Sequence, residues 1–197
     1  MDRDSIFAPY RLIIGGVVLV LFVLTFLFLR GPAFWQRLYY PLPEQHREAI
    51  EASSARHTVN PYLIAAVIDA ESAWDPETRS KAGAVGLMQI LPSTAEELRA
   101  SGTVDPALAG GDLSDPTVNI EFGTAYLRSL VERYHEIETA LAAYNAGMGN
   151  VDEWVDESGD IRESIEFPET RHYVLRVVRA RDVYERLYPD AFPAEVE

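Results

Sequence analysis

Hydrophobic and polar positions divide the chain into an apolar N-terminal run and a longer part with helical periodicity. From Leu12 to Leu29, 18 consecutive residues carry no charge, and arginines bound the run on both sides. This length is just sufficient to cross a hydrocarbon core of about 30 Å. The run is longer than the core of a signal peptide, about 7–15 residues, and no A-x-A cleavage site follows it. We therefore predict an uncleaved transmembrane anchor rather than a cleaved signal peptide.

The segments that flank the apolar run differ in composition. Residues 1–11 form a short N-terminal segment, and residues 30–43 form a linker that is rich in aromatic residues and prolines. Aromatic side chains suit a membrane interface and prolines suit a stiff spacer, although a strand or an arm packed on the domain is an alternative. Two arginines precede the run and two follow it, so charge alone does not determine the orientation of the anchor.

From Glu44 onward, the apolar positions recur with helical spacing, and no stretch alternates as a long strand would. A polar residue followed by proline marks helix starts at Asn60-Pro61 and Asp115-Pro116. The expected helices cover residues 61–72, 92–100, 116–134, 136–143 and 169–188, with one or two further turns near 151–158. We predict an all-α domain of about six or seven helices over residues 44–189, followed by a short tail at 190–197.

Composition and charge exclude several classes of function. The chain of 197 residues has 31 acidic and 17 basic residues, and its net charge of -14 argues against a nucleic-acid-binding surface. Cysteine is absent, so disulfides, thiolate metal sites and a catalytic thiol are excluded. The histidines are scattered without metal-binding spacing, and we therefore expect neither a metal nor another cofactor. They are His46, His57, His135 and His172.

Glu71 stands at the C-terminal end of the apolar helix that is predicted from Pro61 to Ser72. Apolar walls and the negative end of the helix dipole both disfavour its ionised form, so they raise its pKa above the reference value of about 4.3. A glutamic acid that stays protonated near neutral pH can protonate the oxygen of a breaking glycosidic bond. A solvated surface glutamate is the structural alternative, and the position alone favours it.

Two segments that contain glycine interrupt otherwise strong helices. In "GAVGLMQ", residues 83–89, missing side chains let the backbone approach a ligand, and Gln89 can both donate and accept hydrogen bonds, as sugars require. The segment "AYNAG" supplies a phenol, an amide and a glycine turn. A helix stop with Asn145 or Gly147 in the left-handed conformation, and Tyr144 in the core, is the alternative for this segment.

Four motifs follow one another along the chain: Glu71-Ser72 with Ser80 and "GAVGLMQILPSTA", then "LSDPTVNIEFGTAYLRSL", "ALAAYNAGMGNV" and "FPETRHYVLRV". In this order and spacing, they resemble the catalytic domain of the soluble lytic transglycosylases, family 23 of the glycoside hydrolases, which has a goose-type-lysozyme-like fold. The similarity runs from about Asn60 to Tyr188. One small departure is Leu91, where many relatives have methionine of similar volume.

The resemblance implies that Glu71 is the sole catalytic acid and base, and that Ser80 and Gln89 approach the bound sugar beside it. Glu71 would protonate the leaving oxygen, and its ionised form would then deprotonate the sugar's own 6-hydroxyl to give a 1,6-anhydro ring. A conventional glycosidase needs a second carboxylate. Asp69 is expected on another face of the helix and Asp75 in the following turn, so neither is an obvious partner.

The resemblance also implies the walls of a saccharide-binding cleft. Met88 would form part of an apolar wall. Tyr144 and Asn145 would line the cleft and hold the N-acetyl-bearing saccharide. Tyr173 would reach from the last helix toward the reacting centre.

The implied function is that of a bacterial peptidoglycan lytic transglycosylase, which cuts between N-acetylmuramic acid and N-acetylglucosamine during cell-wall remodelling. This glycan lies outside the cytoplasmic membrane, so we expect residues 1–11 in the cytoplasm and the domain outside, on a single-pass anchor. The expected partners are glycan strands, the membrane, and cell-wall synthesis or division proteins that the sequence does not identify. A hydrolytic lysozyme on the same fold would instead leave reducing ends. A non-catalytic glycan-binding scaffold would lack Glu71 or the AYNxG motif, and both are present.

Overall fold

The computed structural model describes residues 3–157 and 161–192, without the side chains of residues 3–9, 11, 29–30, 32–33 and 156–157. The chain divides into two units, Met1–Pro41 and Leu42–Glu197. Most of the tail that was predicted at 190–197 lies outside the described residues, which end at Phe192.

One long helix, α1 (Arg3–Tyr39), makes up most of the first unit and is interrupted at Gly31, which has φ 62° and ψ 174°. Gly31 precedes Pro32, and a residue before proline is disfavoured in the helical conformation. Proline is well accommodated in the first turn of a helix, so the helix resumes after Gly31 and continues to Tyr39. The predicted linker at 30–43 is therefore helical as far as Tyr39.

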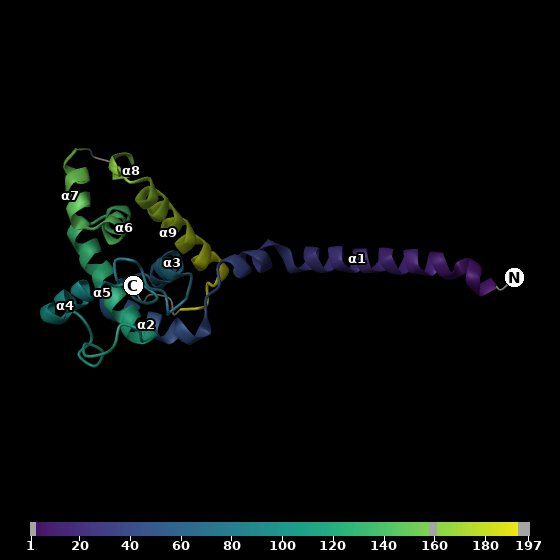
Figure 1. Cartoon of the computed structure of the whole chain (residues 1–197), viewed down its shortest axis with the longest axis horizontal. Helices are drawn as coiled ribbons and strands as arrows, with labels where there is room; N and C mark the ends of the chain where they lie inside the picture. The colour runs from purple at the N-terminus through teal and green to yellow at the C-terminus, as the bar shows by residue number, and fades with distance from the viewer. Residues whose placement is uncertain (1–2, 158–160, 193–197) are drawn as a thin grey trace. The chain divides into compact units, whose positions relative to one another are not determined.

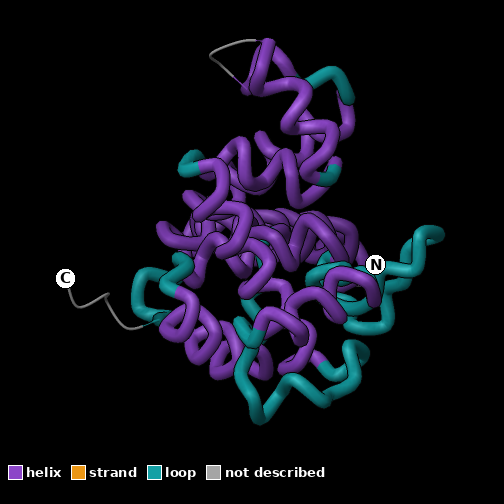
Figure 2. The backbone as a smooth tube through the Cα atoms, turned by 90° about the vertical axis from the view of Figure 1, so that its left-hand side faces the viewer, coloured by secondary structure: helices purple, strands orange, loops and turns teal. Residues whose placement is uncertain are grey.

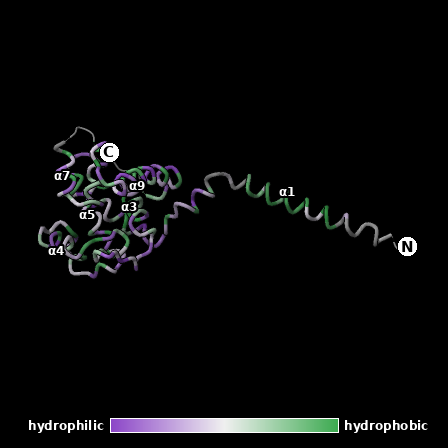
Figure 3. The backbone as a smooth tube through the Cα atoms, turned by 45° about the horizontal axis from the view of Figure 1, so that its top comes forward, coloured by the Kyte–Doolittle hydropathy of each residue, from purple (hydrophilic) through white to green (hydrophobic). Residues whose placement is uncertain are grey.

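Apolar side chains are exposed along the middle of α1, where the hydrophobic colouring is concentrated in this unit (Figure 3). Phe22 is 67% exposed and Phe28 is 85% exposed. Within the part of the chain that the structure describes, no helix combines the length and the apolar character needed to cross a membrane. The transmembrane helix predicted from Leu12 to Leu29 is therefore not supported. The side chain of Leu29, where that segment ends, lies outside the described residues.

The second unit is helical, which confirms the predicted all-α class (Figures 1 and 2). Between residues 42 and 157 and between 161 and 192, extended pairing is limited to isolated bridges that Val85 makes with Arg79 and Ile90. The helices are η1 (Glu44–His46), α2 (Arg47–His57), α3 (Pro61–Ser72), α4 (Pro92–Ser101), α5 (Pro116–Tyr134), α6 (Ile137–Ala146), α7 (Met148–Glu157), α8 (Ile161–Ser164) and α9 (Pro168–Leu187).

Both predicted helix caps are present. The side-chain oxygen of Asn60 accepts hydrogen bonds from the backbone N–H groups of Tyr62 and Leu63, at 2.8 and 3.1 Å, so α3 begins where predicted. Asp115 makes the same pair of bonds at the start of α5, at 2.8 and 3.2 Å. Caps of this kind satisfy N–H groups that have no partner inside the helix.

The region between α6 and α9 differs from the prediction. We expected a helix that ends near residue 143 and a broad turn over "NAGMGN", whereas α6 continues to Ala146 and α7 begins at Met148. Gly147 alone separates the two helices, with φ 88°, and its N–H bonds to the carbonyl of Ala143 at 2.9 Å. A single glycine is sufficient because it adopts a positive φ without steric cost. The short helix α8 was not predicted.

The core of the second unit surrounds α3. This helix packs along α9, while α5 packs against both α2 and α6, and α6 in turn contacts α9 (Figure 1). Each buried Leu, Ile or Phe side chain contributes about 1.5–3 kcal/mol, so a helix buried on nearly every face has a well-defined position. The largest completely buried side chains include Ile64, Ile68, Leu87, Met88, Phe122, Leu127, Leu141 and Tyr184.

Candidate active site

Glu71 lies in the last turn of α3, and the chain turns sharply directly after it. Ala73 and Trp74 both adopt left-handed conformations, with φ 50° and 69°, and the N–H of Ala73 bonds to the carbonyl of Asp69 at 3.1 Å. Left-handed non-glycine residues cost about 1–2 kcal/mol each and persist only where tertiary contacts hold them. Here the indole N–H of Trp74 donates to the Tyr184 hydroxyl at 3.1 Å, so α9 helps to hold the turn after Glu71.

Burial raises the pKa of Glu71 to about 7, even though an interaction with the Tyr173 hydroxyl and the positive charge of Arg176 act in the opposite direction. A carboxyl group with this pKa is about half protonated at neutral pH. It can therefore donate a proton and accept one within the same catalytic cycle.

Two tyrosines surround this carboxyl group. The Tyr173 hydroxyl, on α9, is buried beside Glu71 but makes no hydrogen bond of ordinary geometry with the described residues. The Tyr144 hydroxyl, on α6, donates to the carbonyl of Met88 at 2.8 Å. Burial, followed by the nearby Glu71 carboxylate, raises the pKa of both phenols well above the ordinary value. Both hydroxyls therefore remain hydrogen-bond donors.

Asn119, which we did not predict as a site residue, organises the glycine-containing loop. Its side-chain oxygen accepts from the N–H of Met88 at 2.7 Å, and its amide nitrogen donates to the carbonyls of Val85 and Leu113 at 2.8 and 2.9 Å. A methyl group at Gly86, where φ is +80°, would lie 2.4 Å from that nitrogen. Glycine at position 86 is thus required both by the backbone conformation and by the close approach of Asn119.

A signal for Asn119 exists in the sequence. It lies on the same face of the predicted helix as Gly123 and Leu127, at intervals of four residues, and this face proves to be buried. A polar side chain on a buried helical face needs hydrogen-bond partners. The sequence alone does not identify those partners.

The structure places Met88 beneath the site rather than on its surface. The side chain is completely buried, and a methyl group at Gly123 would lie 2.4 Å from its sulfur. The expected apolar wall therefore does not come from an exposed Met88 side chain. Its backbone carbonyl accepts the hydrogen bond from Tyr144.

Gln89 and Ser80 both make hydrogen bonds within the loop. The amide nitrogen of Gln89 donates to the carbonyls of Thr78 and Gly86 at 2.9 and 2.8 Å. The exposed Ser80 accepts a hydrogen bond on its hydroxyl oxygen from the N–H of Ala84 at 3.0 Å. These bonds shape the loop that follows Glu71, in addition to any contact with a sugar.

Asn145 joins the end of α6 to the start of α9. Its side-chain oxygen accepts a hydrogen bond from the hydroxyl of Thr170 at 2.8 Å, and Thr170 is only 1% exposed. The helix-stop interpretation required either Asn145 or Gly147 in the left-handed conformation. Gly147 terminates α6, so Asn145 is not needed for this purpose. The exposed Asn145 side chain keeps its two amide protons for other contacts. The partnership with Thr170 was not predicted.

The two acidic residues closest to Glu71 in the sequence are directed elsewhere. Asp69 interacts with Tyr184 and Trp74, and its pKa is raised mainly by burial. Asp75 is exposed, and its carboxylate accepts a hydrogen bond from the N–H of Glu77 at 3.0 Å, as a turn-capping residue does.

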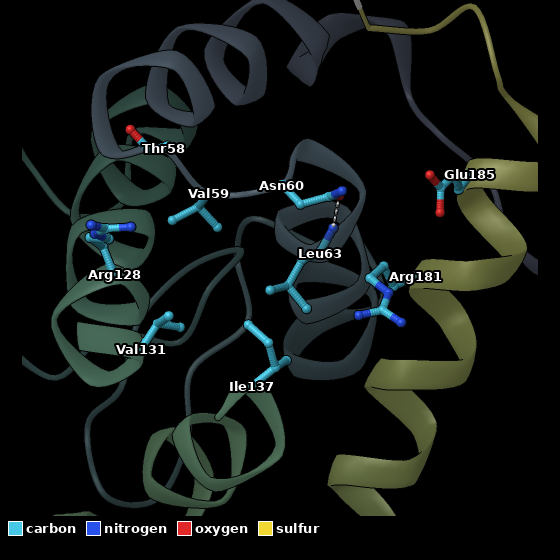
Figure 4. Close-up of a pocket in the computed structure, with 9 residues that line it drawn as sticks. All are labelled: Thr58, Val59, Asn60, Leu63, Arg128, Val131, Ile137, Arg181 and Glu185. Atoms are coloured by element: carbon cyan, nitrogen blue, oxygen red, sulfur yellow. Dashed lines mark hydrogen bonds between the residues drawn. The ribbon is translucent and has the colours of Figure 1, made fainter. Parts of the chain in front are cut away.

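A pocket with a volume of about 210 Å³ lies at the N-terminal end of α3, which is the end opposite to Glu71 (Figure 4). Its two arginines are paired with carboxylates: Arg128 with Glu132 at 2.8 Å and Arg181 with Asp182 at 2.7 Å. The pocket is therefore distinct from the Glu71 site. Its lining consists of Thr58, Val59, Asn60, Leu63, Arg128, Val131, Ile137, Arg181 and Glu185.

Comparison with known proteins gives consistent results. Residues 48–167 match the family model described as "Transglycosylase SLT domain". The soluble lytic murein transglycosylase of Escherichia coli (strain K12) is 34% identical over 161 residues, which are 78% of this chain and 25% of that protein. The membrane-bound lytic murein transglycosylase F of Desulfosudis oleivorans is 39% identical over 134 residues, which are 64% of this chain and 27% of that protein.

Solved structures agree with these sequence matches. The X-ray structure of an inactive mutant of the lytic transglycosylase Slt from Pseudomonas aeruginosa superimposes with a TM-score of 0.68 and 32% identity, covering 77% of this chain and 25% of that one. The chain thus spans about a quarter of the length of these relatives. Because the family model covers more than half of the sequence, the chain belongs to the family that carries the transglycosylase SLT domain.

Proposed function

We propose that this domain is a peptidoglycan lytic transglycosylase with Glu71 as its only catalytic acid and base. One observation carries the proposal: Glu71 is a partly buried carboxyl group with a pKa of about 7, flanked by the phenols of Tyr173 and Tyr144. Asp69 and Asp75 make their contacts elsewhere. A single carboxyl group near neutral pKa suits a reaction in which one group gives and then takes a proton.

In the proposed reaction, protonated Glu71 donates its proton to the oxygen between N-acetylmuramic acid and N-acetylglucosamine, and the glycosidic bond breaks. The resulting carboxylate takes the proton of the 6-hydroxyl of the same muramic acid residue. The freed oxygen attacks the anomeric carbon and closes a 1,6-anhydro ring, so no water is consumed. Intramolecular attack is fast because the nucleophile is already held beside the reacting centre.

The remaining site residues hold the saccharide in this proposal. Tyr144 and Asn145 bind the N-acetyl-bearing sugar, and the Tyr173 hydroxyl, which makes no hydrogen bond of ordinary geometry with the described residues, donates to the reacting region. Ser80 and Gln89 belong to the loop beside the reacting region, and the buried Met88 side chain supports that loop. The names of the relatives support this substrate class, since they are lytic murein transglycosylases.

The products distinguish this activity from its alternatives. Purified cell-wall sacculi are incubated with the protein, and the released fragments are analysed by mass spectrometry. We expect 1,6-anhydro ends, which are lighter than reducing ends by one water molecule. Reducing ends would identify a hydrolytic lysozyme. Binding to sacculi without any release would identify a glycan-binding scaffold.

A separate proposal concerns the N-terminal segment and the location of the domain in the cell. We propose that the uncharged run from Leu12 to Leu29 attaches the domain to the cytoplasmic membrane, on the side that faces the cell wall, near cell-wall synthesis or division proteins. The support is the absence of charge in the run and the exposure of its described apolar side chains. Retention in the membrane fraction after a high-salt wash is expected, because apolar attachment is insensitive to salt. Release by salt, or recovery of a soluble form that begins near Gly31, would contradict it.

A further inference from the structure

Arg176 on α9 contacts both sides of the Glu71 site. One guanidinium nitrogen donates to the carbonyl of Ala70 at 2.7 Å, and Ala70 directly precedes Glu71 in the last turn of α3. The guanidinium carbon lies 6.0 Å from the centroid of the Tyr173 ring. A single side chain therefore bridges the backbone that carries the carboxyl group and the phenol that faces it.

Arg176 is an exposed residue, and its bond to Ala70 lies at the surface, at the end of α3. The last carbonyls of a helix lack partners inside the helix and carry partial negative charge, so a cation that binds one of them stabilises the helix end. The rigid fork of an arginine side chain fixes direction as well as distance. The end of α3, where Glu71 is carried, is thereby tied to α9.

The groups that face Glu71 from the surrounding helices are mostly neutral phenols. Among the described residues that influence this site, Arg176 carries the positive charge, and it favours the ionised form of the Glu71 carboxyl group. The groups are Tyr173 and Arg176 from α9, Tyr144 from α6, Tyr126 of α5 behind Tyr144, and Asp69 within α3.

We propose that Arg176 is a positioning residue for the acid–base cycle of Glu71, because it fixes the end of α3 against the Tyr173 ring and stabilises the carboxylate that forms when Glu71 gives up its proton. This role rests on the proposed function, in which Glu71 must lose and regain a proton in each turnover. It was not expected from the sequence, where Arg176 is one of several arginines on an amphipathic helix.

The test measures the protonation of Glu71 directly. In protein that carries ¹³C-labelled glutamate, the Glu71 carboxyl signal is assigned by its loss in Glu71→Gln and then followed as a function of pH. In Arg176→Gln, the midpoint should rise by roughly half a pH unit or more, since a nearby positive charge is removed. Arg176→Met, which keeps the aliphatic stem, should give the same rise. Arg176→Lys should stay close to wild type.

Arg179→Gln is the matched control, because Arg179 is an exposed arginine on the same helix, one turn further along. It removes the same formal charge, and the Glu71 midpoint should not move. Thermal unfolding checks that all variants remain folded. If the two neutral Arg176 variants titrate like Arg179→Gln, the proposal is wrong.

Activity provides a second readout. The alkaline limb of fragment release from sacculi should move to higher pH in Arg176→Gln, in parallel with the carboxyl titration, and the maximal rate should fall about threefold or more. An unchanged limb would contradict the proposal. If the wild-type protein releases no fragments at any pH, the proposed function fails, while the titration still decides whether Arg176 acts on Glu71.

Discussion

Glu71 is partly buried and Glu121 is completely buried in the second unit, and their pKa values are shifted in opposite directions. Burial raises the pKa of both carboxyl groups. At Glu121, which is 0% exposed, hydrogen bonds and the nearby histidine outweigh burial and bring the pKa to about 2. The partners of Glu121 are Ser53 at 2.7 Å, Arg56 at 2.8 Å, His57 at 2.9 Å and the N–H of Asp105 at 2.8 Å.

The number of donors therefore decides what each carboxyl group can do. Glu121 joins α2, α5 and the segment around Asp105 through bonds to a permanent carboxylate, which is a structural role. Among the described residues, only the phenol of Tyr173 and the positive charge of Arg176 act to lower the pKa of Glu71, so neither protonation state is strongly favoured at neutral pH. A group that must exchange a proton needs this lack of partners.

Glu71→Gln should have the largest effect on activity. The amide keeps the shape of the side chain but has no transferable proton, so fragment release from sacculi should fall roughly 10²–10⁴-fold. Binding to sacculi, measured by co-sedimentation, should persist. Activity within threefold of wild type would remove Glu71 from its assigned role.

Asp75→Asn is the control for that experiment, because Asp75 is exposed and caps a turn. Its fragment release should remain within about twofold of wild type. A large loss of turnover in a folded Asp75→Asn protein would revive the lysozyme mechanism with two carboxylates.

Glu121→Gln should affect stability rather than chemistry. Breaking a buried ion pair by removing one partner costs roughly 3–5 kcal/mol, since the remaining charged groups lose their counterpart. Chemical denaturation should show this loss in the free energy of unfolding. At a temperature where the variant remains folded, fragment release should be near that of wild type, and a selective loss of turnover would contradict the structural role.

The two glutamates should also give opposite dependences of stability on pH. The pKa of Glu121 is depressed, so its contribution is present above the unfolded pKa near 4.5 and is lost as pH falls toward 2. The pKa of Glu71 is raised, so ionisation costs stability as pH rises from about 4.5 to about 7.

Unfolding free energies measured across these two ranges separate the contributions. Glu71→Gln should reduce the change in unfolding free energy between about pH 4.5 and pH 7 by roughly 1–3 kcal/mol. Glu121→Gln should reduce the change below about pH 4.5 instead. If each variant instead changed the range assigned to the other, the contrast between the two sites would be wrong.

Apart from the controls, Tyr144→Phe should have the smallest effect. It removes the hydrogen bond from the phenol to the Met88 carbonyl and should cost about 1 kcal/mol of stability. Because that bond also positions the loop beside Glu71, fragment release should fall by a few fold. Tyr134→Phe, which removes a hydroxyl that bonds to Asp152 on α7, is a matched control and should leave fragment release unchanged. Equal activity losses in the two variants would argue against a local role for Tyr144.

Helix starts were the most predictable features of the fold. Asn60 and Asp115 occupy the caps that the sequence predicted, because cap bonds join residues that are two or three positions apart. The limits of α6, α7 and α8 were less predictable, since Gly147 alone is sufficient to divide α6 from α7. The position of Glu71 at the end of a buried helix also followed from the sequence, because it too depends on residues that are close together in the chain.

The sequence by itself determined the helical class of the domain, the caps and the placement of Glu71 at the end of an apolar helix. Only the tertiary structure decided which groups surround that carboxyl: Tyr173 and Arg176 come from α9 and Tyr144 from α6, far along the chain. It also decided that Met88 is buried and that Asn119 shapes the loop. Local bonds depend on neighbours in the chain, whereas burial and the number of donors around a carboxyl group depend on how distant helices pack.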